Sequence, residues 1–157
     1  MNTELFERYN ANPKGKVTQD CVIRALSLFL NKSYDTILND LLDVYKHTGF
    51  HIADPVCFMY YLKQIPKIRQ YSVDYTKHLR LLDLCEYVDT HFYSENSITN
   101  TQNHNEFSKI THKNCNKILV LLENTHLTFV KNSVIIDTWN CSCLKIVAYF
   151  YFLPEGD

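Results

Sequence analysis

Residues 118–137 read ILVLLENTHLTFVKNSVIID and contain three short apolar runs separated by polar residues. The runs are 118–122, 127–130 and 134–136, and a fourth run of the same character covers 146–152. All four are rich in the β-branched, aromatic and large apolar residues that favour strands. We therefore predict that the end of the chain forms an antiparallel sheet.

Helical patterns fill the first half of the chain. Residues 21–30 are apolar on nearly every face and predict a buried helix, with Thr18 and Asp20 as candidate caps. Ser33 can cap a second helix that ends near Gly49. Pro55 suits the first turn of a third helix, and residues 78–91 predict a fourth.

A short strand over residues 68–73 is expected between the third and fourth helices. Because helices come first and strands follow, we expect an α+β domain in which amino-terminal helices pack on a carboxy-terminal antiparallel sheet, the first helix against it. We treat residues 1–157 as one domain, with a polar insertion near 93–116 that is rich in Asn, Ser and Thr.

The composition excludes several classes of protein. A hydrophobic content of 46% in 157 residues is enough to bury a core. The formal net charge is −1, so no overall field would attract nucleic acid or anionic lipid, and neither is an expected partner. No uncharged apolar run approaches the roughly 18 to 20 residues that cross a bilayer.

The first eight residues have neither the basic start nor the apolar stretch of a secretory signal. We therefore expect a cytoplasmic protein in a reducing environment, with its six cysteines as thiols. Nothing in the sequence indicates an oligomeric state.

Cys21 falls at the first turn of the predicted buried helix. Unpaired backbone N–H groups and the helix dipole favour an anion there, and a thiolate is a nucleophile. The ordinary alternative is a small apolar residue in a core. A catalytic role requires a base and an orienting group elsewhere in the chain.

His126 and Asp137 supply that second half. If Lys131 and Asn132 form a two-residue turn and Val130 pairs with Ser133, His126 lies directly opposite Asp137. Opposed residues have Cβ atoms about 4.5–5.5 Å apart, close enough for a carboxylate to accept a hydrogen bond from an imidazole. This pair can act as base and orienting residue, and the alternative is two surface residues at strand ends.

Two further residues are candidates for supporting roles. Trp139 should lie on the same face as Asp137 and can shield the pair from water, or simply pack in the core. An oxyanion would need donors, for which the backbone N–H of Cys21 is one candidate. Gln19 is the nearest side-chain amide, with Asn10, Asn12 and Asn140 as competitors.

The order of a cysteine on an early helix, then histidine and aspartate on later antiparallel strands, resembles the papain-like cysteine peptidase fold. The residues that carry the resemblance are Asn12–Lys16, Asp20–Ala25, Thr125-His126 and Asp137–Trp139. They look like those of small papain-like proteins encoded by bacteriophages and mobile elements. The resemblance covers residues 10–31 and 119–140.

The resemblance implies a cysteine peptidase or amidase with a Cys21, His126, Asp137 triad, a protein or peptide substrate, no cofactor and no metal. If phage-encoded, the protein would work in the cytoplasm of the host cell. Two positions depart from the family pattern. Gln19 stands only two residues before the cysteine, where the family's oxyanion glutamine stands several before it, and Val22-Ile23 replaces small residues.

Two readings from other classes stay open. Cys141 and Cys143, with Cys85, His112 or Cys115, could form a structural metal site, although one intervening residue is less typical of zinc than two. The chain could also be a binding or inhibitor module that keeps a hydrolase fold without turnover, because fold alone does not entail function.

Overall fold

The computed structural model describes residues 5–16, 19–93, 104–107, 110 and 116–155. Thr18, His112, Cys115 and most of the expected polar insertion lie outside these residues. The elements run in the order β1 (Phe6–Arg8), α1 (Cys21–Leu30), α2 (Tyr34–Thr48), α3 (Pro55–Lys63), β2 (Ile68–Ser72), α4 (Leu81–Val88), α5 (His104–Phe107), β3 (Lys117–Leu122), β4 (Leu127–Lys131), β5 (Val134–Asp137) and β6 (Ile146–Phe152).

The protein is α+β, with a six-stranded mixed sheet in the order β1-β5-β4-β3-β6-β2. Strands β3, β4, β5, β6 and β2 pair antiparallel, as expected for the end of the chain, but β1 pairs parallel with β5. The expectation of a purely antiparallel sheet is therefore wrong at the β1 edge, whereas β2 at the other edge is the short strand expected over residues 68–73. One edge strand comes from the amino terminus and the other from the middle of the chain.

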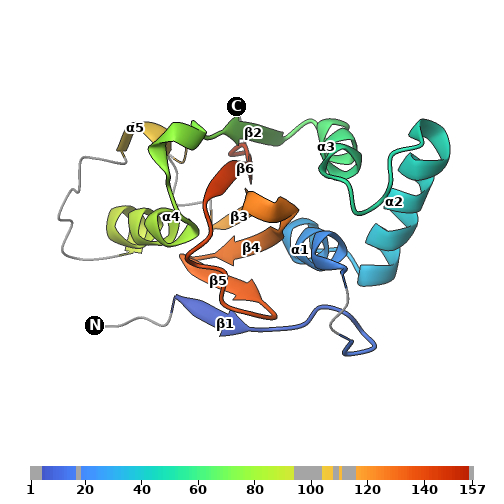
Figure 1. The fold of residues 1–157 in the computed structure, drawn as a ribbon, viewed down its shortest axis with the longest axis horizontal. Helices are drawn as coiled ribbons and strands as arrows, with labels where there is room; N and C mark the ends of the chain where they lie inside the picture. Colours follow the sequence, from blue (N-terminus) through green and yellow to red (C-terminus); the bar gives the residue numbers. More distant parts are fainter. Residues whose placement is uncertain (1–4, 17–18, 94–103, 108–109, 111–115, 156–157) are drawn as a thin grey trace.

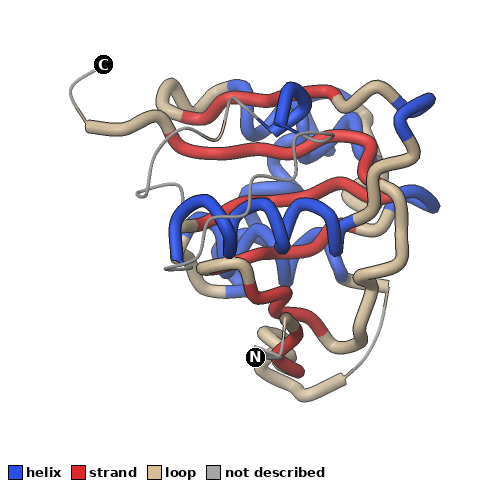
Figure 2. The backbone as a smooth tube through the Cα atoms, turned by 90° about the vertical axis from the view of Figure 1, so that its left-hand side faces the viewer, coloured by secondary structure: helices blue, strands red, loops and turns tan. Residues whose placement is uncertain are grey.

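Helices cover both faces of the sheet (Figure 1). Because side chains alternate along a strand, Leu119 and Phe129 face the core shared with α1, α2 and α3, whereas Val120 and Tyr149 face the core shared with α4. Figure 2 views the molecule from the α4 side, with that helix in front of the sheet. Phe107 of α5 and Ile110, within the expected polar insertion, are buried on this second face.

Local signals account for the helix ends. The Ser33 side chain accepts a hydrogen bond from the N–H of Thr36 at 3.1 Å, and Gly49 ends α2 with φ of 77°. Pro55 opens α3. The fourth helix begins at Leu81 rather than at residue 78, because His78 has a left-handed backbone with φ of 50° that ends a preceding 3-10 turn.

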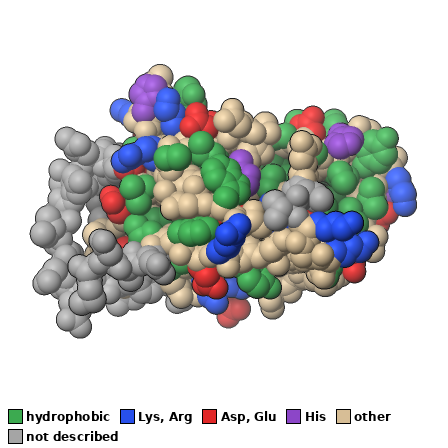
Figure 3. Space-filling model, turned by 60° about the horizontal axis from the view of Figure 1, so that its bottom comes forward, with side chains coloured by type: hydrophobic (Ala, Val, Ile, Leu, Met, Phe, Trp, Pro, Cys, Tyr) green, Lys and Arg blue, Asp and Glu red, His purple; other side chains and the backbone are tan. Residues whose placement is uncertain are grey.

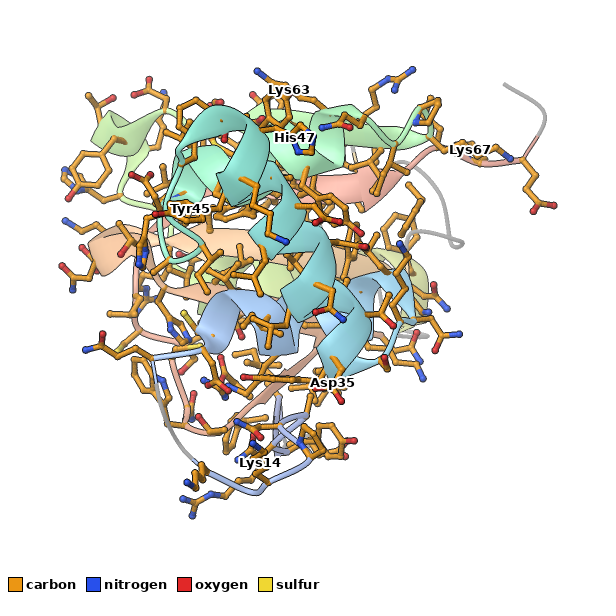
Figure 4. All side chains as sticks on the ribbon, turned by 90° about the vertical axis from the view of Figure 1, so that its right-hand side faces the viewer. Lys14, Asp35, Tyr45, His47, Lys63 and Lys67 are labelled. Atoms are coloured by element: carbon orange, nitrogen blue, oxygen red, sulfur yellow. The ribbon has the colours of Figure 1, made fainter. Side chains whose placement is uncertain are left out.

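Helix α1 packs on β4 and β3, as expected. Its Leu26 and Phe29 are fully buried, and burying a side chain of this size contributes about 1.5–3 kcal/mol. This packing fixes the start of α1 against the sheet. Helix α2 lies outside it, with Asp35, Tyr45 and His47 along the side of the molecule that Figure 4 shows.

Charged side chains of both signs are scattered over the face in Figure 3, with apolar groups between them. Within the described ranges, no helix is both long enough and apolar enough to cross a membrane.

Candidate active site

Cys21 is the first residue of α1 and is partly buried. Asp20 occupies the N-cap position, but its side chain makes no capping hydrogen bond, so its expected capping role is wrong. The carboxylate instead accepts hydrogen bonds of 2.8 Å from each of Arg24 Nε, Asn12 Nδ2 and the Tyr34 hydroxyl. The reason is burial: Asp20 is 6% exposed, and a buried carboxylate requires strong donors.

The β4–β5 hairpin differs from the predicted register. Its turn residues are Asn132 and Ser133, both with positive φ, rather than Lys131 and Asn132. Val130 pairs with Ile135, and continuing this register places Thr128 opposite Asp137. Two successive left-handed residues give a turn whose twist suits a hairpin, and Asn is common in such turns.

His126 nevertheless contacts Asp137, since it lies two residues before Thr128 and so on the same face of the hairpin. Its Nε2 atom is 2.8 Å from Asp137 Oδ2. The predicted contact is present, but it is diagonal rather than directly across. Long side chains reach such diagonal neighbours.

The Asp137 carboxylate is 5% exposed and is surrounded by donors. Thr128 Oγ1 donates to Oδ2 at 2.6 Å, and the N–H of Thr138 donates to Oδ1 at 2.7 Å. Burial raises the pKa of Asp137, but the hydrogen bonds from His126 and Thr128 and the charge of His126 outweigh it, so the net pKa is lowered. Asp137 is therefore ionised and able to orient an imidazolium.

The Cys21 thiol and the His126 imidazole line the same cleft. Burial raises the pKa of the thiol, but the hydrogen bond with His126, a hydrogen bond with the backbone of Leu127 and the charges of His126 and Arg24 give a net lowering. Burial lowers the pKa of His126, and its hydrogen bonds with Asp137, Cys141 and Cys21 raise it well above its usual value. Both shifts favour a thiolate beside an imidazolium at neutral pH.

A cleft of about 420 Å³ opens at this pair, with Gln19, Cys21, Asn124, Thr125, His126 and Trp139 in its wall. The Trp139 ring lies 5.1 Å from the His126 ring between centroids, and the residue is 44% exposed. Trp139 therefore lies beside the imidazole rather than in the core, and its shielding role stays a prediction. The cleft makes the thiol accessible to a ligand.

Of the amides considered as oxyanion donors, Gln19 is exposed and lines the cleft. Asn12 is buried and donates to Asp20, and Asn10 donates to the carbonyl oxygen of Lys16 at 3.1 Å. Asn124 is a further amide in the wall that sequence reasoning missed. The oxyanion role of Gln19 stays a prediction.

Arg24 and Thr128 were also missed. A lone arginine in an apolar helix, four residues after an aspartate, is a signal for a buried ion pair. Arg24 is 6% exposed and contacts both Asp20 and Asp137. Thr128 gives no such signal, because alternation along a strand does not reveal which residue a hydroxyl will meet.

The alternative of a structural metal site built from several cysteines is not assembled by the cysteines that the structure describes. Cys141 is buried with its Sγ atom 3.8 Å from Asp137 Oδ2, whereas Cys143 is exposed. His126, Asp137 and Cys141 do offer three ligand atoms within 4.8 Å of one another. Tetrahedral zinc would hold such atoms about 3.3–3.8 Å apart. The 2.8 Å contact of His126 with Asp137 is shorter and fits a hydrogen bond.

No protein-family model, no curated protein and no solved structure matches this chain.

Proposed function

We propose that this chain is a cysteine-dependent hydrolase of amide or peptide bonds with papain-like chemistry, in which Cys21 is the nucleophile, His126 the base and Asp137 the orienting residue. The observation that carries the proposal is that Cys21 and His126 line the same cleft, with Nε2 of His126 bonded to Asp137 at 2.8 Å. The papain-like arrangement is supported by the order of these groups, at the start of an early helix, directly before β4 and at the end of β5.

The proposed reaction begins with the thiolate of Cys21. Its sulfur attacks the carbonyl carbon of the substrate, and the N–H groups at the start of α1 stabilise the oxyanion. Gln19 is the candidate second donor. Because Nε2 of His126 is bonded to Asp137, Nδ1 is the nitrogen that carries the transferred proton.

The tetrahedral intermediate collapses when His126 gives its proton to the leaving amine, and a thioester to Cys21 remains. Water then enters the cleft and loses a proton to His126 as it attacks the thioester. Release of the carboxylic acid expels Cys21 as a thiolate beside the reprotonated His126 and completes the cycle.

Labelling of the native protein with iodoacetamide tests the proposal, with the rate at each cysteine read by peptide mass spectrometry. Near pH 6, we expect Cys21 to react at least about tenfold faster than the exposed Cys143, because its lowered pKa increases the fraction present as thiolate. His126→Ala should remove this advantage. His47→Ala is the matched control, since His47 is exposed on α2, and it should leave the rate unchanged.

Labelling of Cys21 no faster than Cys143 in the wild-type protein would contradict the proposal and favour a binding module without turnover. If labelling is fast, a library of internally quenched peptides identifies the substrate class. The same library should show no hydrolysis with Cys21→Ala.

A further inference from the structure

Arg24 is a buried charged residue to which the proposed reaction gives no task. It projects from α1, and its side chain is 7% exposed. Its Nε atom donates to Asp20 Oδ1 at 2.8 Å, and its Nη1 atom donates to Asp137 Oδ1 at 3.3 Å and to Thr138 Oγ1 at 3.0 Å. One guanidinium thus joins the start of α1 to the end of β5.

The two oxygens of Asp137 have different partners. Oδ1 accepts from Arg24 and from the N–H of Thr138, whereas Oδ2 accepts from Thr128 and lies 2.8 Å from His126 Nε2. A carboxylate held at Oδ1 cannot rotate freely about its last bond. Arg24 therefore contributes to keeping Oδ2 directed at the imidazole.

The other end of Arg24 is equally fixed. Asp20 also accepts hydrogen bonds from Asn12 and Tyr34, so it is a rigid anchor, and it directly precedes Cys21 in the chain. The contacts run from Asp20, next to Cys21, through Arg24 and Asp137 to His126, and they form a ring because Cys21 and His126 line the same cleft. Movement of the nucleophile relative to its base would have to break this ring.

Stability alone is a weak reason for such an arrangement. Removing an arginine and two carboxylates from water costs free energy that their mutual attraction often only offsets. The planar guanidinium, by contrast, suits the task of fixing two carboxylates at a defined distance and angle.

We propose that Arg24 is a positioning residue for the reaction, which holds the Asp137 carboxylate with Oδ2 toward His126 and fixes Cys21 at the start of α1 relative to β5. This inference rests on the proposed function. Arg24 acts through Asp137 and Asp20 and need not touch the substrate.

The pH dependence of Cys21 labelling depends on the charged and titratable groups around Cys21 and His126. His126 and Arg24 carry positive charge near the thiol, Asp137 lies behind the imidazole, and Cys141 contacts both His126 and Asp137. Loss of the guanidinium removes one cation and loosens Asp137, and both changes favour the neutral thiol.

The experiment measures the rate of Cys21 labelling by iodoacetamide across pH in the full-length wild-type protein, in Arg24→Lys and in Arg24→Met. Lysine keeps the charge but cannot bond both carboxylates as a fork. We expect the profile of Arg24→Lys to move to higher pH by about one unit, which is about a tenfold loss of rate on its acidic side. Arg24→Met should move further. Arg69→Met is the control, because Arg69 is exposed and its guanidinium donates to the backbone carbonyl oxygens of Pro66 and Ile68, and it should show no shift.

Thermal unfolding is followed in the same variants. A folded Arg24→Lys protein with a lowered Tm and an unchanged pH profile would overturn the inference and leave Arg24 a purely structural residue. If Arg24→Met does not fold, Arg24→Lys alone decides. Slow labelling of Cys21 in the wild-type protein would instead defeat the proposed function itself.

Discussion

The pKa values of two cysteines on opposite faces of the sheet, Cys21 and Cys85, are shifted in opposite directions. On the face that carries α1, Cys21 is surrounded by His126 and Arg24, and its pKa is lowered despite burial. On the face that carries α4, burial raises the pKa of Cys85 strongly, and the nearby Cys141, Glu86 and Asp89 raise it further. Burial raises the pKa of both thiols, and the difference teaches that at Cys21 hydrogen bonds and neighbouring positive charge outweigh it, whereas at Cys85 nothing does.

The largest expected effect is the difference in labelling between these two cysteines in the folded wild-type protein. Each unit of pKa changes the thiolate fraction tenfold, and Cys85 is also fully buried, so we expect Cys85 to react at least about a thousandfold more slowly than Cys21 at pH 7. Its rate should rise with urea as the molecule opens. Comparable rates without urea would break the comparison.

Asp137→Asn tests whether charge behind the imidazole sustains the thiolate. The amide keeps an acceptor for His126 but removes the carboxylate charge, so the pKa of His126 should fall and that of Cys21 should rise. We expect labelling of Cys21 at pH 7 to drop about tenfold or more. Asp43→Asn, on the exposed surface of α2, is the control and should label normally.

The free energy of unfolding should depend on pH through the shifted pKa values of His126 and Cys21. The raised pKa of His126 gives stability that is full below its ordinary value of 6.5 and is lost as pH rises above it. The lowered pKa of Cys21 gives stability that is full above its ordinary value of 9.0 and is lost as pH falls through the folded-state pKa. Above the folded-state pKa of Cys21 and below pH 9.0 the two slopes oppose each other, so in that range this pair should leave the free energy of unfolding level.

Cys21→Ser removes one of these slopes. Its free energy of unfolding should fall between those two pH values, by at most about 1.4 kcal/mol per pH unit, because solvent in the cleft screens the pair. Chemical denaturation at a series of pH values measures this. Parallel profiles for Cys21→Ser and wild type would show that the thiol and imidazole titrate independently.

The smallest expected effect is that of Thr128→Val. Valine keeps the shape of threonine but removes the 2.6 Å hydrogen bond to Asp137. A single such bond contributes about 1 kcal/mol, so labelling of Cys21 should fall about fivefold. Thr76→Val provides the control, since Thr76 is exposed and its hydroxyl donates to Asp74 at 2.7 Å. An unchanged rate in Thr128→Val would assign the orientation of Asp137 to its remaining donors.

Local sequence signals predicted the helices well. Ser33, Gly49 and Pro55 mark helix ends through capping and backbone preferences that act within a few residues. Strand β1 was missed because three residues carry too little pattern, and its partner lies at the other end of the chain. The covering of the second sheet face by α4 was likewise not predicted, since it depends on contacts remote in sequence.

The contact of His126 with Asp137 was predicted correctly, although the register of the hairpin was not. The turn was placed one residue early, which changed the partner of Asp137 from Thr128 to His126. Strand alternation kept both residues on one face, so the imidazole still reaches the carboxylate. Arg24 could not be placed in the same way, because nothing local to α1 identifies an aspartate 113 residues away as its partner.

The amino-terminal edge strand β1 ends beside Asp137. Arg8 pairs with Asp137 in the parallel register, and the N–H of Tyr9 donates to the Asp137 carbonyl oxygen at 2.8 Å. The main chain of the acidic residue is therefore clamped by a segment from the opposite terminus, independently of its side-chain partners. A protease that severed residues 5–9 from the rest would release this clamp while leaving α1 whole, so limited proteolysis there would be expected to silence the thiol before the molecule unfolds.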